Sequence, residues 1–398
     1  MMRILVLFFC CFFIFSVQSK EKNGVTVSPW LYKKSKKIEK LIAKKSYSQA
    51  QQKLEEILSD VKKGKYEHAF VLKSLSSVHA LKGSYNKAAE LLAKSIALKV
   101  MPTEEEQQAI LNLGQLYMAT DLYDKAIRTL EPWLKTHPNP DLQINVLVAN
   151  AYTQLKHYRK ALPYIKNAIA QSKKPKEAWY QLNLAIYYEL EEYSSAIDVL
   201  KILVRRYPDK ETYWQQLSSI YQQVKQYKKA VSIKSLAYKK GFMTTEKEIL
   251  DLANLFLYIS SPYKAAKILE QEFKQKRIKH TSKNWEMLAN AWTMAKELDL
   301  AVKALETASS LNSKGSLYLQ LGQIYVGLEK WNQAIESLKK ALNKGGLKNA
   351  GAAHLLLGMS YYEINEIKTA KESFSKATKF SKSKKSAKQW IDYIKESS

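Results

Sequence analysis

Hydrophobic residues recur along this chain at the spacing of helices rather than of strands. From residue 31 to residue 380, apolar positions lie three or four residues apart in one short stretch after another. This spacing gives each helix a single apolar stripe that must be buried. Glycine and proline number only 12 and 9, too few for sandwiches and barrels, which need a turn about every 8–12 residues. The pattern therefore predicts an all-α chain.

The apolar stripes also repeat as a group, about every 33 to 38 residues. The clearest copy lies near the C-terminus, and the next copy reproduces its offsets. The first contains Leu321-Gly322, Tyr325, Leu328, Trp331, Ala334, Leu338 and Ala341, and the second contains Leu357-Gly358, Tyr361, Ile364, Ile367, Ala370, Phe374 and Ala377. Four further copies begin at Leu113, Val148, Leu217 and Trp285, and four weaker ones begin at Leu41, Leu75, Trp179 and Phe256. The sequence thus contains ten units.

This ladder resembles the tetratricopeptide repeat over about 350 of the 398 residues. The resemblance implies a right-handed α-solenoid superhelix of about ten helix–turn–helix units, each of which buries its stripe against its neighbours. The array is expected at residues 31–380. Ala387, Trp390 and Ile394 then follow at helical spacing, so residues 381–398 are predicted to form a C-terminal capping helix.

The first 19 residues predict a secretory signal peptide. A basic start at Arg3 precedes an apolar run over residues 4–17, and small or modest residues lead to a cleavage site after Ser19. The run has about 14 residues, whereas a membrane-spanning helix needs about 20, so an uncleaved anchor is the less favoured alternative. Residues 20–30 carry no repeat signal and are expected to form a flexible lead-in.

The two cysteines bear on the compartment. Cys10 and Cys11 both lie inside the apolar run, and lipid attachment at either would cut that run in half. After cleavage the chain would have no thiol, so nothing could be mispaired in an oxidising compartment. We therefore expect a periplasmic protein.

The net charge of +27 comes almost entirely from lysine, because only six of the 64 basic residues are arginine. Arginine recognises phosphate through two hydrogen bonds at once, whereas lysine is a hydrated point charge. Together with the export signal, this argues against a nucleic-acid partner. Two interpretations of the charge stay open: a solvated lysine-rich surface, or attraction to an acidic partner, an anionic membrane surface or the cell wall.

The chain lacks the motifs that catalysis or cofactor binding would need. No Walker loop, GxGxxG or GxSxG occurs in it. No two of the six histidines are three or four residues apart, as two metal ligands on one helix face would be. We therefore expect a protein that is not an enzyme and that holds no cofactor and no metal.

In a tetratricopeptide solenoid the concave wall is built from the first helix of each unit, and here those positions are rich in amides. The candidate partner-binding residues are Asn112, Gln115, Asn150, Gln154, Gln215, Ser219, Gln222, Asn290, Gln320 and Gln323. Amide side chains donate and accept hydrogen bonds at once, so they can pair with the backbone of an extended peptide. A merely solvated polar surface and a site for sugar polymers are the alternatives.

A clamp for the C-terminal carboxylate of a chaperone is not expected. Lys73 and Asn112 match two positions of the clamp known in this family, but Ser77, Gln143 and Leu147 break the pattern. The predicted export of the chain points the same way.

The last segment of the chain resembles periplasmic tetratricopeptide proteins that accompany TonB-type energy-transduction systems in marine gammaproteobacteria. The similarity lies in residues 345–349, 354–359 and 388–391. It implies an accessory role in proton-motive-force-driven uptake across the outer membrane, for instance of iron complexes. The partner would be an extended segment of a periplasmic or inner-membrane complex component.

The alternative is a scaffold or binding module for exopolysaccharide or cell-wall assembly, in which tryptophan rings would stack on sugars. The candidates are Trp179, Trp214, Trp285 and Trp292. All four occupy packing positions of the repeat, which favours a place in the core.

Overall fold

The computed structural model describes residues 27–137, 141–312 and 314–396, and these residues fold into 21 helices and no strands. The first ten helices are α1 (Pro29–Ala43), α2 (Tyr47–Asp60), α3 (Tyr66–Leu81), α4 (Tyr85–Ala97), α5 (Thr103–Ala119), α6 (Tyr123–Thr136), α7 (Leu142–Gln154), α8 (Tyr158–Gln171), α9 (Glu177–Glu189) and α10 (Tyr193–Arg206). They are followed by α11 (Glu211–Gln223), α12 (Tyr227–Lys239), α13 (Glu246–Tyr258), α14 (Pro262–Lys274), α15 (Ser282–Met294), α16 (Leu298–Leu311), α17 (Gly315–Gly327), α18 (Trp331–Lys344), α19 (Ala350–Glu363), α20 (Ile367–Ala377) and α21 (Ser381–Glu396). The predicted all-α fold class is confirmed.

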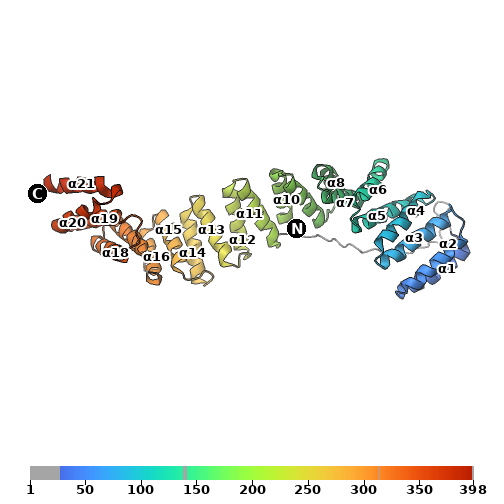
Figure 1. The fold of residues 1–398 in the computed structure, drawn as a ribbon, viewed down its shortest axis with the longest axis horizontal. Coiled ribbons are helices and arrows are strands. Elements are labelled where there is room, and N and C mark those ends of the chain that lie inside the picture. The colour runs from blue at the N-terminus through green and yellow to red at the C-terminus, as the bar shows by residue number, and fades with distance from the viewer. Residues whose placement is uncertain (1–26, 138–140, 313, 397–398) are drawn as a thin grey trace. The chain divides into compact units, whose positions relative to one another are not determined.

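The first twenty helices form ten pairs, and α21 follows the last pair (Figure 1). Contacts run mainly between successive helices, and first helices of neighbouring pairs also touch, as α5 touches α7 and α17 touches α19. This is the order of contacts that defines an α-solenoid, in which each pair packs on its neighbours. The contacts divide the chain into two compact units, residues 1–203 and residues 204–398.

A left-handed residue ends the first helix of every pair. These residues are Lys45, Gly83, Asp121, Lys156, Glu191, Lys225, Ser260, Lys296, Glu329 and Asn365, all with φ between 55° and 78°. At Lys225, for example, the backbone N–H donates to the Gln222 carbonyl at 2.9 Å, and the next N–H donates to the Tyr221 carbonyl at 2.8 Å. These bonds satisfy carbonyls that the end of a helix leaves unpaired. The turn then points the chain back into the second helix.

Small residues bring the two helices of a pair close together. A Cβ added at Gly322 would lie 2.6 Å from the Leu338 side chain, and one added at Gly358 would lie 2.6 Å from the ring of Phe374. Leu338 and Phe374 are fully buried. A glycine in the first helix therefore faces a bulky residue in the second, as close helix packing requires.

The terminal helix α21 covers the last pair. Ala387 and Ile394 are buried, with at most 1% of their surface exposed. Trp390 stacks on Phe374 with ring centres 5.4 Å apart and an angle of 6° between the planes. The last unit therefore does not end on an open core.

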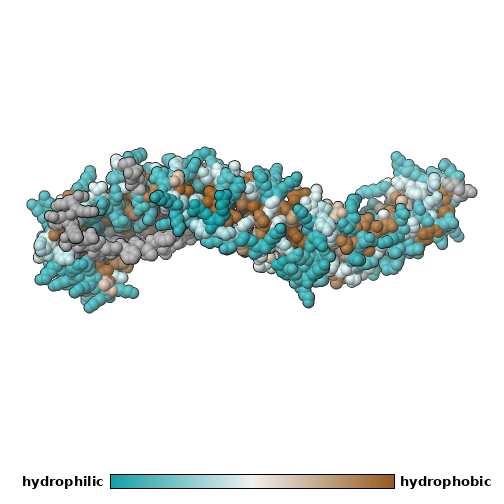
Figure 2. Space-filling view, turned by 180° about the vertical axis from the view of Figure 1, so that it is seen from behind, coloured by the Kyte–Doolittle hydropathy of each residue, from teal (hydrophilic) through white to brown (hydrophobic). Residues whose placement is uncertain are grey.

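On the face drawn in Figure 2, hydrophobic side chains lie in narrow bands between hydrophilic ones.

The N-terminal predictions fall mostly outside the described residues. The signal peptide at residues 1–19, and the lead-in up to residue 26, stay predictions. Helix α1 begins at Pro29, where the Ser28 hydroxyl accepts a hydrogen bond from the Leu31 N–H at 3.3 Å, so the last two residues of the expected lead-in are helical. None of the helices in the described ranges combines the length and apolar character needed to cross a membrane.

Candidate functional site

The ten candidate residues all lie on odd-numbered helices, the first helices of their pairs. In residues 1–203 they lie on α5 and α7, and in residues 204–398 they lie on α11, α15 and α17. None is buried: Gln154, Gln215, Ser219, Asn290 and Gln323 are exposed, and the other five are half-exposed. We call this exposed polar face of the odd-numbered helices the first-helix wall. The role of its residues in binding stays a prediction.

Some amides of the first-helix wall tie neighbouring first helices together. The Nε2 atom of Gln320 on α17 donates to the Glu286 carboxylate on α15 at 3.3 Å. Gln215 on α11 does the same to Glu248 on α13, also at 3.3 Å. Asn150 instead donates to a carbonyl of its own helix at 3.0 Å. These bonds hold the side chains in place and leave part of their capacity open.

Other members of the first-helix wall keep their full capacity. In the described part of the chain, the side chains of Gln115, Gln154, Asn290 and Gln323 make no hydrogen bond with another protein group. Each offers two donors and a carbonyl acceptor. Such groups suit a ligand that presents alternating N–H and C=O groups, which is what an extended peptide backbone does.

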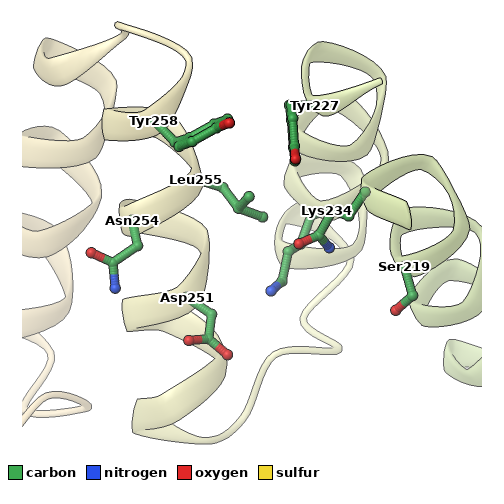
Figure 3. A pocket seen from close by; sticks show the side chains of 8 residues that line it. Ser219, Tyr227, Lys234, Asp251, Asn254, Leu255 and Tyr258 are labelled. Carbon is green, nitrogen blue, oxygen red and sulfur yellow. The ribbon is translucent and has the colours of Figure 1, made fainter. Parts of the chain in front are cut away.

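A pocket interrupts the first-helix wall between α11, α12 and α13 (Figure 3). We call it the α11–α13 pocket. It has a volume of about 580 Å³ and is lined by Ser219, Gln222, Tyr227, Lys234, Asp251, Asn254, Leu255 and Tyr258. Figure 3 shows Lys234 between the two tyrosines and Asp251. The pocket brings two of the predicted residues, Ser219 and Gln222, together with six that were not predicted.

The α11–α13 pocket combines an aromatic edge with a half-buried cation. The rings of Tyr227 and Tyr258 meet edge to face, with centres 4.5 Å apart, and the neighbouring Tyr227 hydroxyl raises the pKa of Tyr258. Burial lowers the pKa of Lys234, while the carboxylates of Asp251 and Glu248 oppose that shift. The ammonium has therefore lost part of its water without gaining a close anion.

Signals for some of the missed residues exist in the sequence. Asn254 holds the same place in α13 as Asn290 does in α15, six residues before the left-handed residue of the turn. The unit that contains it has a weak repeat pattern because Pro262 stands where the other units have an aromatic or large aliphatic residue. Lys234 fills a gap in the apolar ladder of its unit. Tyr227 belongs to the repeat pattern itself, and only the structure shows that it borders a pocket.

The residues suggested for a sugar-binding site or a chaperone-tail clamp are engaged in packing or in ion pairs. Trp179, Trp214 and Trp292 are buried, with 3–8% of their surface exposed, and Trp285 stacks on Phe273 with ring centres 4.3 Å apart. None of the four is an exposed platform for a sugar ring. Lys73, which matched one position of the chaperone-tail clamp, forms an ion pair with Glu105. Across the ranges that the structure covers, no three His, Cys, Asp or Glu residues gather as metal ligands would.

Protein-family models identify a known repeat in parts of this chain. Models of the tetratricopeptide repeat match residues 80–149, and also residues 146–211 and 319–383. A search of curated proteins found no match.

Among the solved structures that match is a tetratricopeptide repeat protein from Parabacteroides merdae, with 17% identity and a TM-score of 0.38. The match covers 65% of this chain and 98% of that protein. YrrB, a tetratricopeptide protein described as having an unusual peptide-binding site, has 13% identity, a TM-score of 0.39, and coverage of 50% and 100%. The yeast Sti1 TPR2AB domain, solved with an Hsp90 peptide, has 14% identity, a TM-score of 0.36, and coverage of 66% and 99%. Residues 80–211 and 319–383 thus contain tetratricopeptide repeats, and the described part of this chain is an α-solenoid of paired helices.

Proposed function

We propose that this chain is a non-catalytic scaffold that binds an extended segment of a protein partner along its first-helix wall. Tetratricopeptide repeats build interaction surfaces of this kind, because stacked pairs leave the exposed face of every first helix available. The observation that carries the proposal is the recurrence of amide side chains at equivalent places on successive first helices, several of them without a protein partner. Such a wall pairs with backbone groups and tolerates many partner sequences.

The proposed location is the periplasm. The sequence of residues 1–19 supports it, since it combines a basic start, an apolar run and a cleavage site. The restriction of cysteine to residues 10 and 11 supports it as well. Recovery of a shortened chain in osmotic-shock fluid would agree with this location, and recovery of the full-length chain in the cytosol would contradict it.

The proposed setting is a TonB-type energy-transduction system, in which the chain would assist uptake of iron complexes. Its support is the similarity of residues 345–349, 354–359 and 388–391 to accessory proteins of such systems. The partner would be a periplasmic or inner-membrane component. Co-purification with inner-membrane transducer proteins, and impaired growth on iron chelates after deletion, are the expected results. Normal growth without such partners would reject this setting.

A role in exopolysaccharide or cell-wall assembly is the competing proposal. It needs exposed rings for sugar stacking, and the four tryptophans suggested for this are packed. Attraction of the +27 chain to an anionic membrane surface or to the cell wall would need no built site. Binding of that kind is lost as salt rises, because screening shortens the reach of surface charges.

The test of the proposed function uses two pairs of amides. The chain from residue 20 onward is used as bait in a periplasmic extract with a short cross-linker. Replacing Asn290 and Gln323 on the first-helix wall by alanine should reduce capture of the partner. The matched control replaces Asn332 and Gln333, exposed residues of the same types on the second helix α18, and should leave capture unchanged. Equal capture by both variants would contradict the role of the first-helix wall.

A further inference from the structure

The eighth residue of each second helix is a core position in this solenoid. In nine of the ten pairs it is leucine, isoleucine or phenylalanine, with at most 3% of its surface exposed. These residues are Leu54, Leu92, Leu130, Ile165, Leu200, Leu269, Leu305, Leu338 and Phe374. The eighth residue of α12 is Lys234.

A lysine at this place departs from the packing of the other nine pairs. A charged group cannot be buried without partners except at a large cost in free energy, and Lys234 is only half-buried. Its side chain lines the α11–α13 pocket (Figure 3), whereas the equivalent residue of each other pair is a buried apolar side chain. Residues that depart from the packing pattern of a fold are concentrated at functional sites, so a ligand is expected at this position.

The Lys234 ammonium has no close anion among the residues that the structure describes. It makes no ion pair and no hydrogen bond with them. The carboxylates of Asp251 and Glu248 act on it only through their charge. Glu248 is engaged elsewhere, since it accepts hydrogen bonds from the Thr245 N–H at 3.1 Å and from Gln215 at 3.3 Å. A carboxylate from outside would give the ammonium the charge-assisted hydrogen bonds that it lacks.

The rest of the pocket suits a peptide rather than a free ion. Tyr258 is 66% exposed and, with Tyr227, forms an apolar edge against which the methylene groups of a side chain can pack. Gln222 and Asn254 lie on the neighbouring first helices α11 and α13, where amides can pair with a backbone. The net charge of +27 favours an acidic occupant.

We propose that the α11–α13 pocket is a specificity subsite that takes an aspartate or glutamate side chain of the partner's extended segment, with its carboxylate on the Lys234 ammonium. The inference rests on the proposed function, because it names one residue type in the segment that the first-helix wall binds. It also explains why a large apolar residue is absent from this one position. Leucine would close the core and remove the cation.

The experiment compares peptide binding by four proteins: the chain from residue 20 onward, its Lys234→Leu and Lys234→Gln variants, and a Lys228→Leu control. Lys228 is an exposed lysine on the same helix, so the control loses the same charge outside the pocket. The probes are arrayed 12-residue peptides from periplasmic proteins, each also made with every Asp and Glu replaced, one at a time, by Asn or Gln. Binding is measured at about 0.15 M salt, which screens charges beyond about 8 Å.

The parent chain and Lys228→Leu should bind some peptides about tenfold more tightly with one particular acidic residue than with its amide. Both Lys234 variants should lose that preference. Lys234→Leu should also raise the melting temperature, because it restores the core residue of the other nine pairs.

An equal preference in Lys234→Leu, or no acidic preference in the parent chain, would overturn the subsite and leave the proposed function standing. Failure of the parent chain to bind any peptide would overturn both proposals. Retention of polygalacturonate in place of peptides would do the same and would favour the carbohydrate role.

Discussion

Substitution of Gly358 by alanine tests whether close packing of helix pairs limits the stability of this solenoid. The added Cβ would lie 2.6 Å from Cε1 of Phe374, 2.7 Å from its Cδ1 and 2.9 Å from its Cζ. The ring has little freedom to move away, because Phe374 is fully buried and stacks on Trp390 of α21. The clash should therefore be transmitted from the last pair to the capping helix.

The expected effect is a net loss of stability. Overpacking of a core costs about 1–3 kcal/mol, and alanine in place of glycine inside a helix returns about 0.5–1 kcal/mol. The difference between the middle values is a destabilisation of about 1 kcal/mol, within limits of about 0–2.5 kcal/mol. Gly327→Ala is the matched control, because nothing lies within 4 Å of its added Cβ. It should stabilise the protein by about 0.4–1 kcal/mol.

Urea unfolding followed by circular dichroism measures the change in stability, and hydrogen exchange locates it. Gly358→Ala should speed exchange in α19, α20 and α21, since local opening follows local stability. Adding Phe374→Ala removes the ring atoms that the new Cβ at position 358 would meet. The double variant should recover stability relative to the sum of the single changes, with a coupling of about 0.5–3 kcal/mol. If Gly358→Ala stabilises the protein as Gly327→Ala does, or if the two changes are additive, the packing argument is wrong.

Three further predictions follow from single residues. Lys156→Gly should stabilise the protein by about 0.5–1 kcal/mol in urea unfolding, because Lys156 has φ of 60° and glycine adopts this conformation without steric cost; no gain would contradict this account of the turn. Arg277→Ala should lower the free energy of unfolding by about 3–5 kcal/mol, because the fully buried Glu272 carboxylate loses the guanidinium whose Nη2 lies 2.6 Å away. The Glu272→Ala, Arg277→Ala double variant should be more stable than Arg277→Ala alone. Burial and repulsion by Lys376 lower the pKa of His354, so the folded state favours the neutral imidazole. The contribution of His354 to stability is therefore lost as the pH falls below about 6.5, where the unfolded chain takes up the proton first. Between pH 7 and pH 5, the melting temperature of His354→Gln should fall less than that of the parent chain.

The fold could be predicted from the sequence because nearly all contacts in a solenoid are local. Within each compact unit, helix pairs pack on the pairs next to them in the chain, so the spacing of residues such as Gly358 and Phe374 contains the information about the contact itself. Ten units and a terminal helix could be counted from this spacing. Exposure of the candidate residues on the first helices follows from the same periodicity.

The repeat pattern did not reveal which groups contact the residues that depart from it. Glu272 occupies the eleventh residue of α14, where α12, α16, α18 and α20 have alanine. Sequence spacing does not show that Tyr238 and Arg277 converge on this carboxylate. Tyr238 lies on α12 and Arg277 lies in the segment that follows α14, and their distances from the carboxylate depend on how the side chains pack in the array.

Sequence alone determined that this chain is a stack of paired helices, since the hydrophobic period specifies which face of each helix must be buried. Only the tertiary structure shows where a pocket lies between the stacked helices. In the sequence, Tyr227 belongs to the repeat pattern, Lys234 interrupts it, and Asp251 looks like an ordinary surface residue. They line one pocket only because α12 and α13 bring them together. A pattern of buried positions can show that one position is unfilled, but only packed coordinates show which groups surround the space that remains.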